Sequence, residues 1–114
     1  MATVFKIISE SDYARARTEG DVPQAPIDLA DGFIHLSAED QVLDTARLYF
    51  TGRDDLVMVG FDTEALRPLL KWEHSRGGAL FPHYYGALSM RLARAARRLV
   101  RRDDGSFALG EVLS

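Results

Sequence analysis

Short apolar runs, separated by turn-forming residues, divide the chain into predicted strands. Residues 3–8 (TVFKII) are mostly β-branched or aromatic, a composition that favours a strand. Residues 56–61 (LVMVGF) form a continuous apolar run, which is typical of a strand covered on both faces, so we place it in the middle of the sheet. Residues 32–36 and 69–74 carry side chains of different character at alternate positions and predict two further strands.

Two helices are predicted from their starts and their apolar spacing. Ser9 stands three residues before Asp12, a capping pattern for a short helix that Gly20 ends. A second helix is expected to start near Ala38, with Ser37 as its N-cap. Its apolar positions repeat at i, i+4, i+7 and i+8: Val42, Ala46, Tyr49 and Phe50.

The connecting segments are predicted from proline, glycine and weak periodicity. Residues 21–31 contain two prolines and predict a loop, and a turn is expected near residues 62–68. Residues 88–100 fit either a helix throughout or a short helix that gives way to a strand. The pair Asp104-Gly105 between two alternating runs is typical of a β-hairpin and favours the second interpretation.

The length of 114 residues is typical of one domain, and the chain has no internal repeat. We therefore predict a single compact domain over residues 1–114, of the α/β (α+β) class, with a mixed or split β-sheet and two to three helices. The absence of cysteine excludes disulfides, thiolate zinc sites and a cysteine nucleophile.

The net charge of -3 gives no general attraction to nucleic acid or to an anionic membrane. No apolar run approaches the ~20 residues that span a bilayer, and residues 1–12 lack the pattern of a signal peptide. We expect a cytoplasmic protein whose partner is a small-molecule ligand, with neither a membrane nor nucleic acid as partner. Six arginines between Arg91 and Arg102 form either a solvated face or a polyanion site.

His35 lies at the end of a predicted strand that runs directly into a predicted helix. Backbone N–H groups and the helix dipole favour an anion at such a place, so His35 is a candidate for binding phosphate. The alternative is a half-buried histidine that hydrogen-bonds a neighbouring carbonyl. For Ser37, helix capping competes with a role in ligand binding.

Glu73 follows Trp72 on a predicted strand. An apolar neighbourhood raises the pKa of a carboxyl group and prepares it for acid or base chemistry. The alternative is a surface glutamate paired with an arginine. His74 falls on the opposite face of the strand from Glu73, and we interpret it as structural.

The segment FPHYYG, residues 81–86, is the densest group of functional side chains. Its proline holds Phe81 extended, and Gly86 allows a sharp turn. Between them lie His83 and Tyr85, and a fixed loop with such side chains is typical of a pocket wall. Phe81 is also explained as a core anchor.

His35, Glu73 and His83 would supply two imidazoles and a carboxylate, the ligand set of zinc hydrolases and non-haem iron sites. Their spacing matches no local metal motif such as HExxH, so we predict no metal and keep a metal-dependent hydrolase as an alternative. The chain has no GxGxxG, P-loop or GxSxG motif, which leaves ordinary dehydrogenase, kinase and α/β-hydrolase activities unsupported.

Taken together, these segments resemble a bacterial family of unknown function, DUF952. Its pattern is a GFIHxS segment, a glutamine shortly after it, an aromatic–glutamate pair and an FPHxYG motif. Here these are residues 32–37, Gln41, residues 72–73 and residues 81–86. The candidate catalytic residues are His35, Glu73, His83 and Tyr85. The candidate ligand-binding residues are Ser37, Gln41, Trp72, Phe81 and Gly86.

The resemblance implies a fold similar to the ADP-ribosyltransferase superfamily, in which a cleft in a split β structure holds NAD as substrate. It implies His35 as the histidine that contacts ribose and Tyr85 as the tyrosine that stacks on nicotinamide. The chain departs from the pattern at the late acid, because Glu73 precedes Tyr85 and the only later glutamate is Glu111. A protein that only binds NAD, ADP-ribose, another phosphorylated nucleoside or another small anion therefore remains an open alternative.

Overall fold

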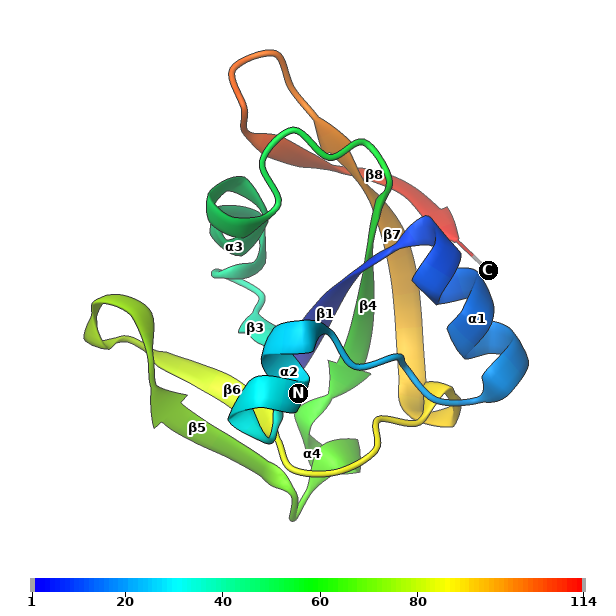
Figure 1. The fold of residues 1–114 in the computed structure, drawn as a ribbon, viewed down its shortest axis with the longest axis vertical. Coiled ribbons are helices and arrows are strands. Elements are labelled where there is room, and N and C mark those ends of the chain that lie inside the picture. The colour runs from blue at the N-terminus through cyan, green and yellow to red at the C-terminus, as the bar shows by residue number, and fades with distance from the viewer. Residues whose placement is uncertain (1, 114) are drawn as a thin grey trace.

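Five antiparallel strands form the larger of two β-sheets in the computed structural model, which describes residues 2–113 and, at residue 76, the backbone alone (Figure 1). The strand order is β3 (Ser37–Ala38), β1 (Thr3–Ser9), β4 (Leu56–Asp62), β7 (Ala93–Arg101) and β8 (Phe107–Leu113). The central position and the burial of β4 confirm what its continuous apolar run predicts. The strand predicted over residues 3–8 is also confirmed, as β1.

A smaller antiparallel sheet lies beside the large one, at the lower left of Figure 1. Its order is β2 (Ile34–His35), β6 (Leu80–Tyr84) and β5 (Leu70–His74). Every pairing between these strands is antiparallel, so of the two arrangements expected, mixed or split, the split one is observed.

The predicted strand 32–36 is a point where the chain changes sheets. Ile34 and His35 pair with β6 of the small sheet, and two residues later Ser37 pairs with Phe5 of the large sheet. Between them, the backbone N–H of Leu36 donates to the Pro82 carbonyl at 3.0 Å. The apolar alternation continues across this change of sheet. The sequence therefore has the pattern of one strand, although the structure has two strands there.

Four α-helices occupy the connections of the described chain, compared with the two to three expected. They are α1 (Glu10–Glu19), α2 (Pro26–Asp31), α3 (Val42–Tyr49) and α4 (Thr63–Leu66). For α1 the predicted cap is confirmed: the Ser9 hydroxyl accepts the backbone N–H of Asp12 at 3.0 Å, and Gly20 ends the helix with a φ of 101°.

Helix α3 begins at Val42 rather than near Ala38, and Ser37 does not cap it. Ser37 is committed to strand β3, and its hydroxyl donates to Oγ1 of Thr45 at 3.0 Å. The N-cap position belongs to Gln41, whose side chain makes no capping bond there.

Helix α2 replaces the loop expected at residues 21–31. Proline suits the first turn of a helix because its missing N–H needs no partner there. Six residues are too few to show an apolar period, so the helix is stabilised by tertiary contacts of Asp28 that the local sequence does not reveal.

The last third of the chain follows the second of its two interpretations. A 3₁₀ turn, η2 (Met90–Leu92), leads directly into β7, and the hairpin to β8 turns at Asp104-Gly105. Another 3₁₀ turn, η1 (Arg76–Gly78), joins β5 to β6.

Two apolar clusters cover the two faces of the large sheet. On one face Val4 and Ile8 of β1 pack with the small sheet, while on the other Phe5 and Ile7 pack with α3. Lys6 lies between Val4 and Ile8, and its buried amine is the exception to the apolar face. No helix of the described residues is long and apolar enough to cross a membrane.

Candidate functional site

One face of the small sheet carries the polar residues singled out from the sequence. His35 of β2 lies directly opposite His83 of β6, which lies opposite Lys71 of β5, and Phe81 lies opposite Glu73. Residues directly opposite each other in antiparallel strands share a face. The sheet thus brings together three segments that are far apart in the sequence.

The imidazole of His35 lies between two carboxylates of α2. Its Nδ1 is 2.7 Å from Oδ1 of Asp28, and its Nε2 is 2.9 Å from Oδ2 of Asp31. Both neighbouring atoms are carboxylate oxygens, which are hydrogen-bond acceptors. His35 is therefore held at a defined orientation by a buried acid on one side and a half-exposed acid on the other.

Asp28 is the centre of this group and is 1% exposed. Oδ2 accepts from Nζ of Lys6 at 2.8 Å and from the backbone N–H of Ala25 at 2.9 Å. Oδ1 accepts from the backbone N–H and the ring of His35. One carboxylate therefore ties β1, α2 and β2 together.

The pKa values of this buried pair are both lowered. Burial is the largest influence on Asp28 and alone would raise the pKa, but the attraction of Lys6 and the hydrogen bonds from Lys6 and His35 outweigh it. Burial lowers the pKa of Lys6, and Asp28 only partly opposes this effect.

We expect Asp28 to make the fold sensitive to acid. Because its folded pKa lies below the ordinary value of 3.8, its stabilising effect is complete above that pH and is lost as the pH falls through the folded pKa. Urea unfolding at several pH values should show that the unfolding free energy of the wild type falls with pH in this acid range. The Asp28→Asn variant should lack the contribution of Asp28 to that fall. The same acid slope in both proteins would contradict the assignment.

Glu73 binds two side chains of the FPHYYG segment with a single oxygen. Its Oε1 is 2.8 Å from Nδ1 of His83 and accepts from the hydroxyl of Tyr85 at 2.6 Å. The hydrogen bond from Tyr85, followed by that from His83, lowers the pKa of Glu73, whereas the sequence predicted a raised pKa beside Trp72. The prediction is wrong because Trp72 projects from the opposite face of β5 and lies half-exposed.

The hydrogen bond to Glu73 also raises the pKa of the Tyr85 phenol. Nζ of Lys71 lies 5.1 Å from the centre of the Tyr85 ring. The phenol is therefore a neutral donor at physiological pH, and Glu73 is an ionised acceptor.

Phe33 packs over the centre of this polar face. Its ring stacks on His83 with centroids 4.1 Å apart and lies 4.6 Å from His35 and 5.3 Å from Tyr85. The two imidazoles are 5.6 Å apart and meet edge to face. An aromatic cover of this kind restricts the rotation of the histidine rings.

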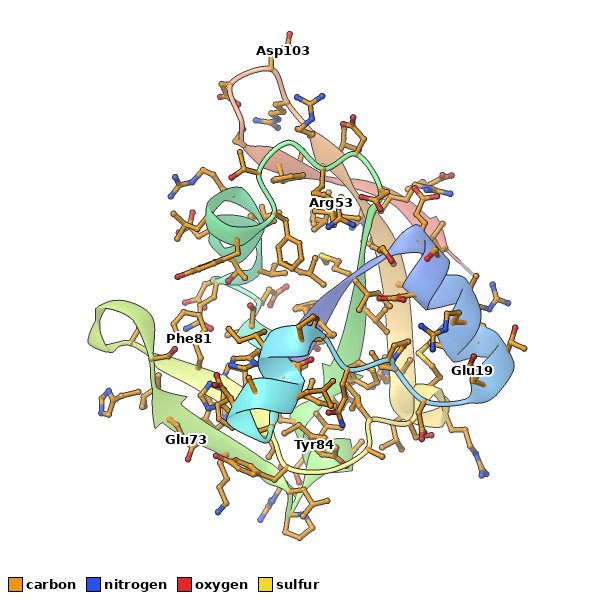
Figure 2. The ribbon with its side chains drawn as sticks, viewed as in Figure 1. Glu19, Arg53, Glu73, Phe81, Tyr84 and Asp103 are labelled. Atoms are coloured by element: carbon orange, nitrogen blue, oxygen red, sulfur yellow. The ribbon has the colours of Figure 1, made fainter. Side chains whose placement is uncertain are left out.

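A cavity of about 490 Å³ opens between the large sheet and the small one. It is bounded by β1, by residues 23–27, by α3 and by β6. Its polar lining includes His35, His83, Ser37 and Thr45, and its aromatic lining is Phe5, Tyr49, Phe50 and Phe81. The volume lies in the range of small-molecule sites. Figure 2 shows Phe81 and Glu73 on the small sheet, with Arg53 on the segment that follows α3.

Of the predicted catalytic residues, His35 and His83 line the cavity, while Glu73 and Tyr85 lie outside its lining and reach it through His83. His35 does not stand at a helix N-terminus, because β3 and a turn separate it from α3. The anion site expected from that helix is therefore not formed there.

The predicted ligand-binding residues divide in the same way. Ser37 and Phe81 line the cavity. Gln41 is a connector: Oε1 accepts the backbone N–H of Ala38 at 2.9 Å, and Nε2 donates to the Leu80 carbonyl at 2.8 Å. Trp72 lies on the other face of the sheet.

Gly86 has a packing role and lies outside the lining of the cavity. It does not have a positive φ, so the turn itself does not require glycine. A Cβ atom at this position would lie 2.9 Å from Cδ1 of Leu69. His74, interpreted as structural, is exposed and places Nδ1 2.7 Å from the Gly78 carbonyl in the β5–β6 connection.

Sequence reasoning missed Lys6, Asp28 and Phe33. Lys6 offered one signal, because it is the only charged residue in an otherwise apolar strand. Asp28 is separated from Lys6 by 22 residues and offered none. Phe33 belongs to the GFIHxS segment but was not recognised as the cover of the two histidines.

The remaining acidic candidates do not gather at the cavity. Among the described residues, no group of three or more histidine, aspartate or glutamate side chains has the geometry to hold a metal ion. Glu111 lies on β8 and pairs with Arg98, so the late glutamate does not reach the cavity.

The arginine-rich segment is largely paired along the large sheet. Arg94 pairs with Asp62, Arg98 with Glu10 and Glu111, and Arg101 with Asp54. Arg97 donates to the Gly110 carbonyl. This pairing favours the solvated face over a polyanion site.

The fold and the site define a class of small α+β proteins in which two antiparallel sheets enclose a cavity bordered by a histidine pair. Residues 7–96 match the profile of the family described as "Protein of unknown function (DUF952)", and the chain belongs to that family. No curated protein matches the chain significantly.

Solved structures of one relative share this fold. The crystal structure of protein CC0527 from Caulobacter crescentus is 40% identical, with a TM-score of 0.88 over 93% of both chains. A double mutant of the same protein is 39% identical, with a TM-score of 0.87 over 93% of both chains. The solution structure of CC0527 is 40% identical, with a TM-score of 0.81 over 91% of this chain and 90% of that one.

Proposed function

We propose that the cavity between the two sheets binds the ADP-ribose part of NAD or a closely related nucleotide, and that the protein is an enzyme of ADP-ribosyltransferase type. The observation that carries the proposal is the place of His35: its imidazole is fixed by two carboxylates at a cavity that lies where the β-structure splits. This is the place at which the resemblance implies a ribose-binding histidine.

The size and lining of the cavity support a nucleotide as ligand. Ribose hydroxyls match the carboxylate of Asp31, which His35 orients, and the hydroxyls of Ser37 and Thr45, and a base can stack on Phe81 or Tyr49. We assign the stacking role that the resemblance implies for Tyr85 to Phe81 or Tyr49 instead. Tyr85 is hydrogen-bonded to Glu73 and does not line the cavity.

The proposed reaction transfers ADP-ribose from NAD to a hydroxyl group or to water. The bond between C1′ of the ribose and the nicotinamide nitrogen breaks, and its electron pair neutralises the pyridinium. A bond from C1′ to the incoming oxygen forms, and the proton of that oxygen must be accepted. Fixed groups that orient the ribose lower the barrier by holding the reacting atoms in place.

A second candidate is a non-catalytic module that binds a small anion or a nucleotide. It is favoured by one observation, namely that neither Glu73 nor Glu111 lines the cavity, so no glutamate of the described chain occupies the position expected for the transfer. The metal-dependent hydrolase receives no support from the geometry, because both nitrogens of His35 already face carboxylates and Nδ1 of His83 faces Glu73.

Incubation of the protein with NAD distinguishes these candidates. We expect nicotinamide to be released, which chromatography of the reaction mixture measures. We also expect ADP-ribose to raise the Tm of the protein. A rise in Tm without nicotinamide release, even with added acceptor alcohols, would favour the binding module. The absence of both turnover and a change in Tm would refute the nucleotide proposal.

A further inference from the structure

His83 differs from His35 in how its two ring nitrogens are used. Nδ1 lies 2.8 Å from Oε1 of Glu73, whereas no side chain or backbone group that the structure describes hydrogen-bonds to Nε2. The structure has no buried side-chain nitrogen or oxygen without a partner among these residues. The unpartnered Nε2 is therefore accessible, and His83 borders the cavity although its side chain is only 6% exposed.

The partner of Nδ1 determines which nitrogen carries the proton in the neutral ring. Glu73 is ionised at physiological pH, because its pKa is lowered by the hydrogen bonds from Tyr85 and His83. An ionised carboxylate can only accept a hydrogen bond, so Nδ1 must be the donor. In the neutral ring Nε2 then carries a free lone pair, and the carboxylate stabilises the ring when Nε2 takes up a proton.

The orientation of the ring is fixed from several sides. Phe33 stacks on one face of it, and His35 meets it edge to face from the neighbouring strand. His83 lines the cavity whereas Glu73 does not, and Nε2 is the ring nitrogen that Glu73 leaves free. A base needs both a free lone pair and a fixed direction, and His83 has both.

We propose that His83 is the general base of the transfer reaction and that Glu73 is the residue that positions it. This inference rests on the proposed function. Nε2 of His83 accepts the proton of the attacking hydroxyl or water as the oxygen bonds to C1′ and neutral nicotinamide leaves. The proton then passes from the ring to solvent, which restores the base. The arrangement explains how transfer proceeds without a late glutamate in the cavity.

The charged groups around the ring set its dependence on pH. Glu73 and Lys71 face it from β5, Tyr85 follows it on the chain, and His35 faces it from β2. Asp28, Asp31 and Lys6 act on it through His35. Glu73 is the acid in direct contact, so its removal should have the largest effect.

The first test needs no substrate. Long-range ¹H–¹⁵N correlation spectra of the protein labelled with ¹⁵N-histidine report which ring nitrogen is protonated. We expect neutral His83 to be protonated at Nδ1 in the wild type, with the signal assigned from its absence in His83→Gln. Protonation at Nε2 would overturn the inference, whether or not the protein turns over NAD.

The second test is the pH profile of nicotinamide release. For the wild type we expect kcat to rise with pH to a plateau, as an unprotonated base requires. His83→Gln should lower kcat by roughly 10²- to 10⁴-fold, the range typical of a lost general base. Glu73→Gln should also lower kcat and should move the rising limb to lower pH, because an amide no longer stabilises the protonated ring.

Affinity for ADP-ribose, measured by calorimetry, separates the role of His83 from ligand binding. We expect His83→Gln and Glu73→Gln to bind ADP-ribose within a few-fold of the wild type, and His74→Ala to retain both binding and kcat. Full kcat in His83→Gln, or an unmoved pH profile in Glu73→Gln, would overturn the inference. If the wild type neither binds ADP-ribose nor releases nicotinamide, the proposed function fails, and with it the role of His83 as base in that transfer, even where the tautomer is as expected.

Discussion

Replacement of Asp28 by alanine should cost about 3–5 kcal/mol of unfolding free energy, the range for removal of one partner of a buried ion pair. Asp28 is buried and accepts four hydrogen bonds, from Lys6, Ala25 and two donors of His35. Its loss leaves the amine of Lys6, which is 5% exposed, without its carboxylate. Urea unfolding monitored by circular dichroism measures the change.

Two further variants show whether this cost comes from the unpaired charge. Asp31→Ala removes the other carboxylate at His35, but that side chain is 45% exposed, so we expect a loss of less than about 1 kcal/mol. Combining Asp28→Ala with Lys6→Met removes both charges and should recover part of the stability. A double variant as unstable as the sum of its single variants would show that the pair is not coupled.

Replacement of His35 by alanine should weaken the binding of ADP-ribose by about tenfold or more, because Asp31, which lines the cavity, loses the imidazole that orients it, and a hydrogen bond to a charged partner is worth about 1.5–3 kcal/mol. The fold should survive, because Asp28 keeps its bonds to Lys6, Ala25 and the backbone N–H of residue 35. Calorimetric titration with ADP-ribose measures the affinity.

The matched control for this variant is His74→Ala, because His74 is an exposed histidine whose Nδ1 contacts the β5–β6 connection. It should bind ADP-ribose as the wild type does. Equal affinities for His35→Ala and wild type, with both proteins folded, would remove His35 from the binding site.

The composition of each strand was sufficient to predict where most of the strands lie in the sequence. The apolar run of β4 placed it in the centre of the large sheet, and the alternation along β5 placed Glu73 and His74 on opposite faces. These signals are local and follow the period of two along a strand. The hairpin between β7 and β8 was equally local, because Asp104-Gly105 favours a tight turn.

The parts that sequence reasoning missed depend on contacts between distant residues. Helix α2 is stabilised by the contacts of Asp28 with Lys6 and His35, and no local sequence pattern predicts these contacts. The switch from β2 to β3 keeps the alternation of one strand, so only the pairing with Tyr84 and Phe5 reveals it. The pKa of Glu73 was predicted with the wrong sign because its hydrogen-bond partners lie ten and twelve residues further along the chain.

The candidate site was predicted as a group of residues but not as a geometry. His35, Glu73, His83 and Tyr85 do converge, since β2, β5 and β6 are neighbours in the small sheet. Which of them faces the cavity could not be read from the spacing, because the cavity is formed against β1 and α3 of the large sheet. The buried acid that contacts His35 is Asp28, which no motif contains.

Every role proposed for these residues depends on the cavity between the two sheets being the ligand site. Titration of ¹⁵N-labelled protein with ADP-ribose, followed by ¹H–¹⁵N correlation spectra, locates the ligand on the fold. We expect the saturable shifts to cluster at residues that line the cavity, among them His35, Ser37, Thr45, Phe81 and His83. Shifts confined to β7 and β8, or no saturable shifts at millimolar ADP-ribose, would contradict this placement of the ligand.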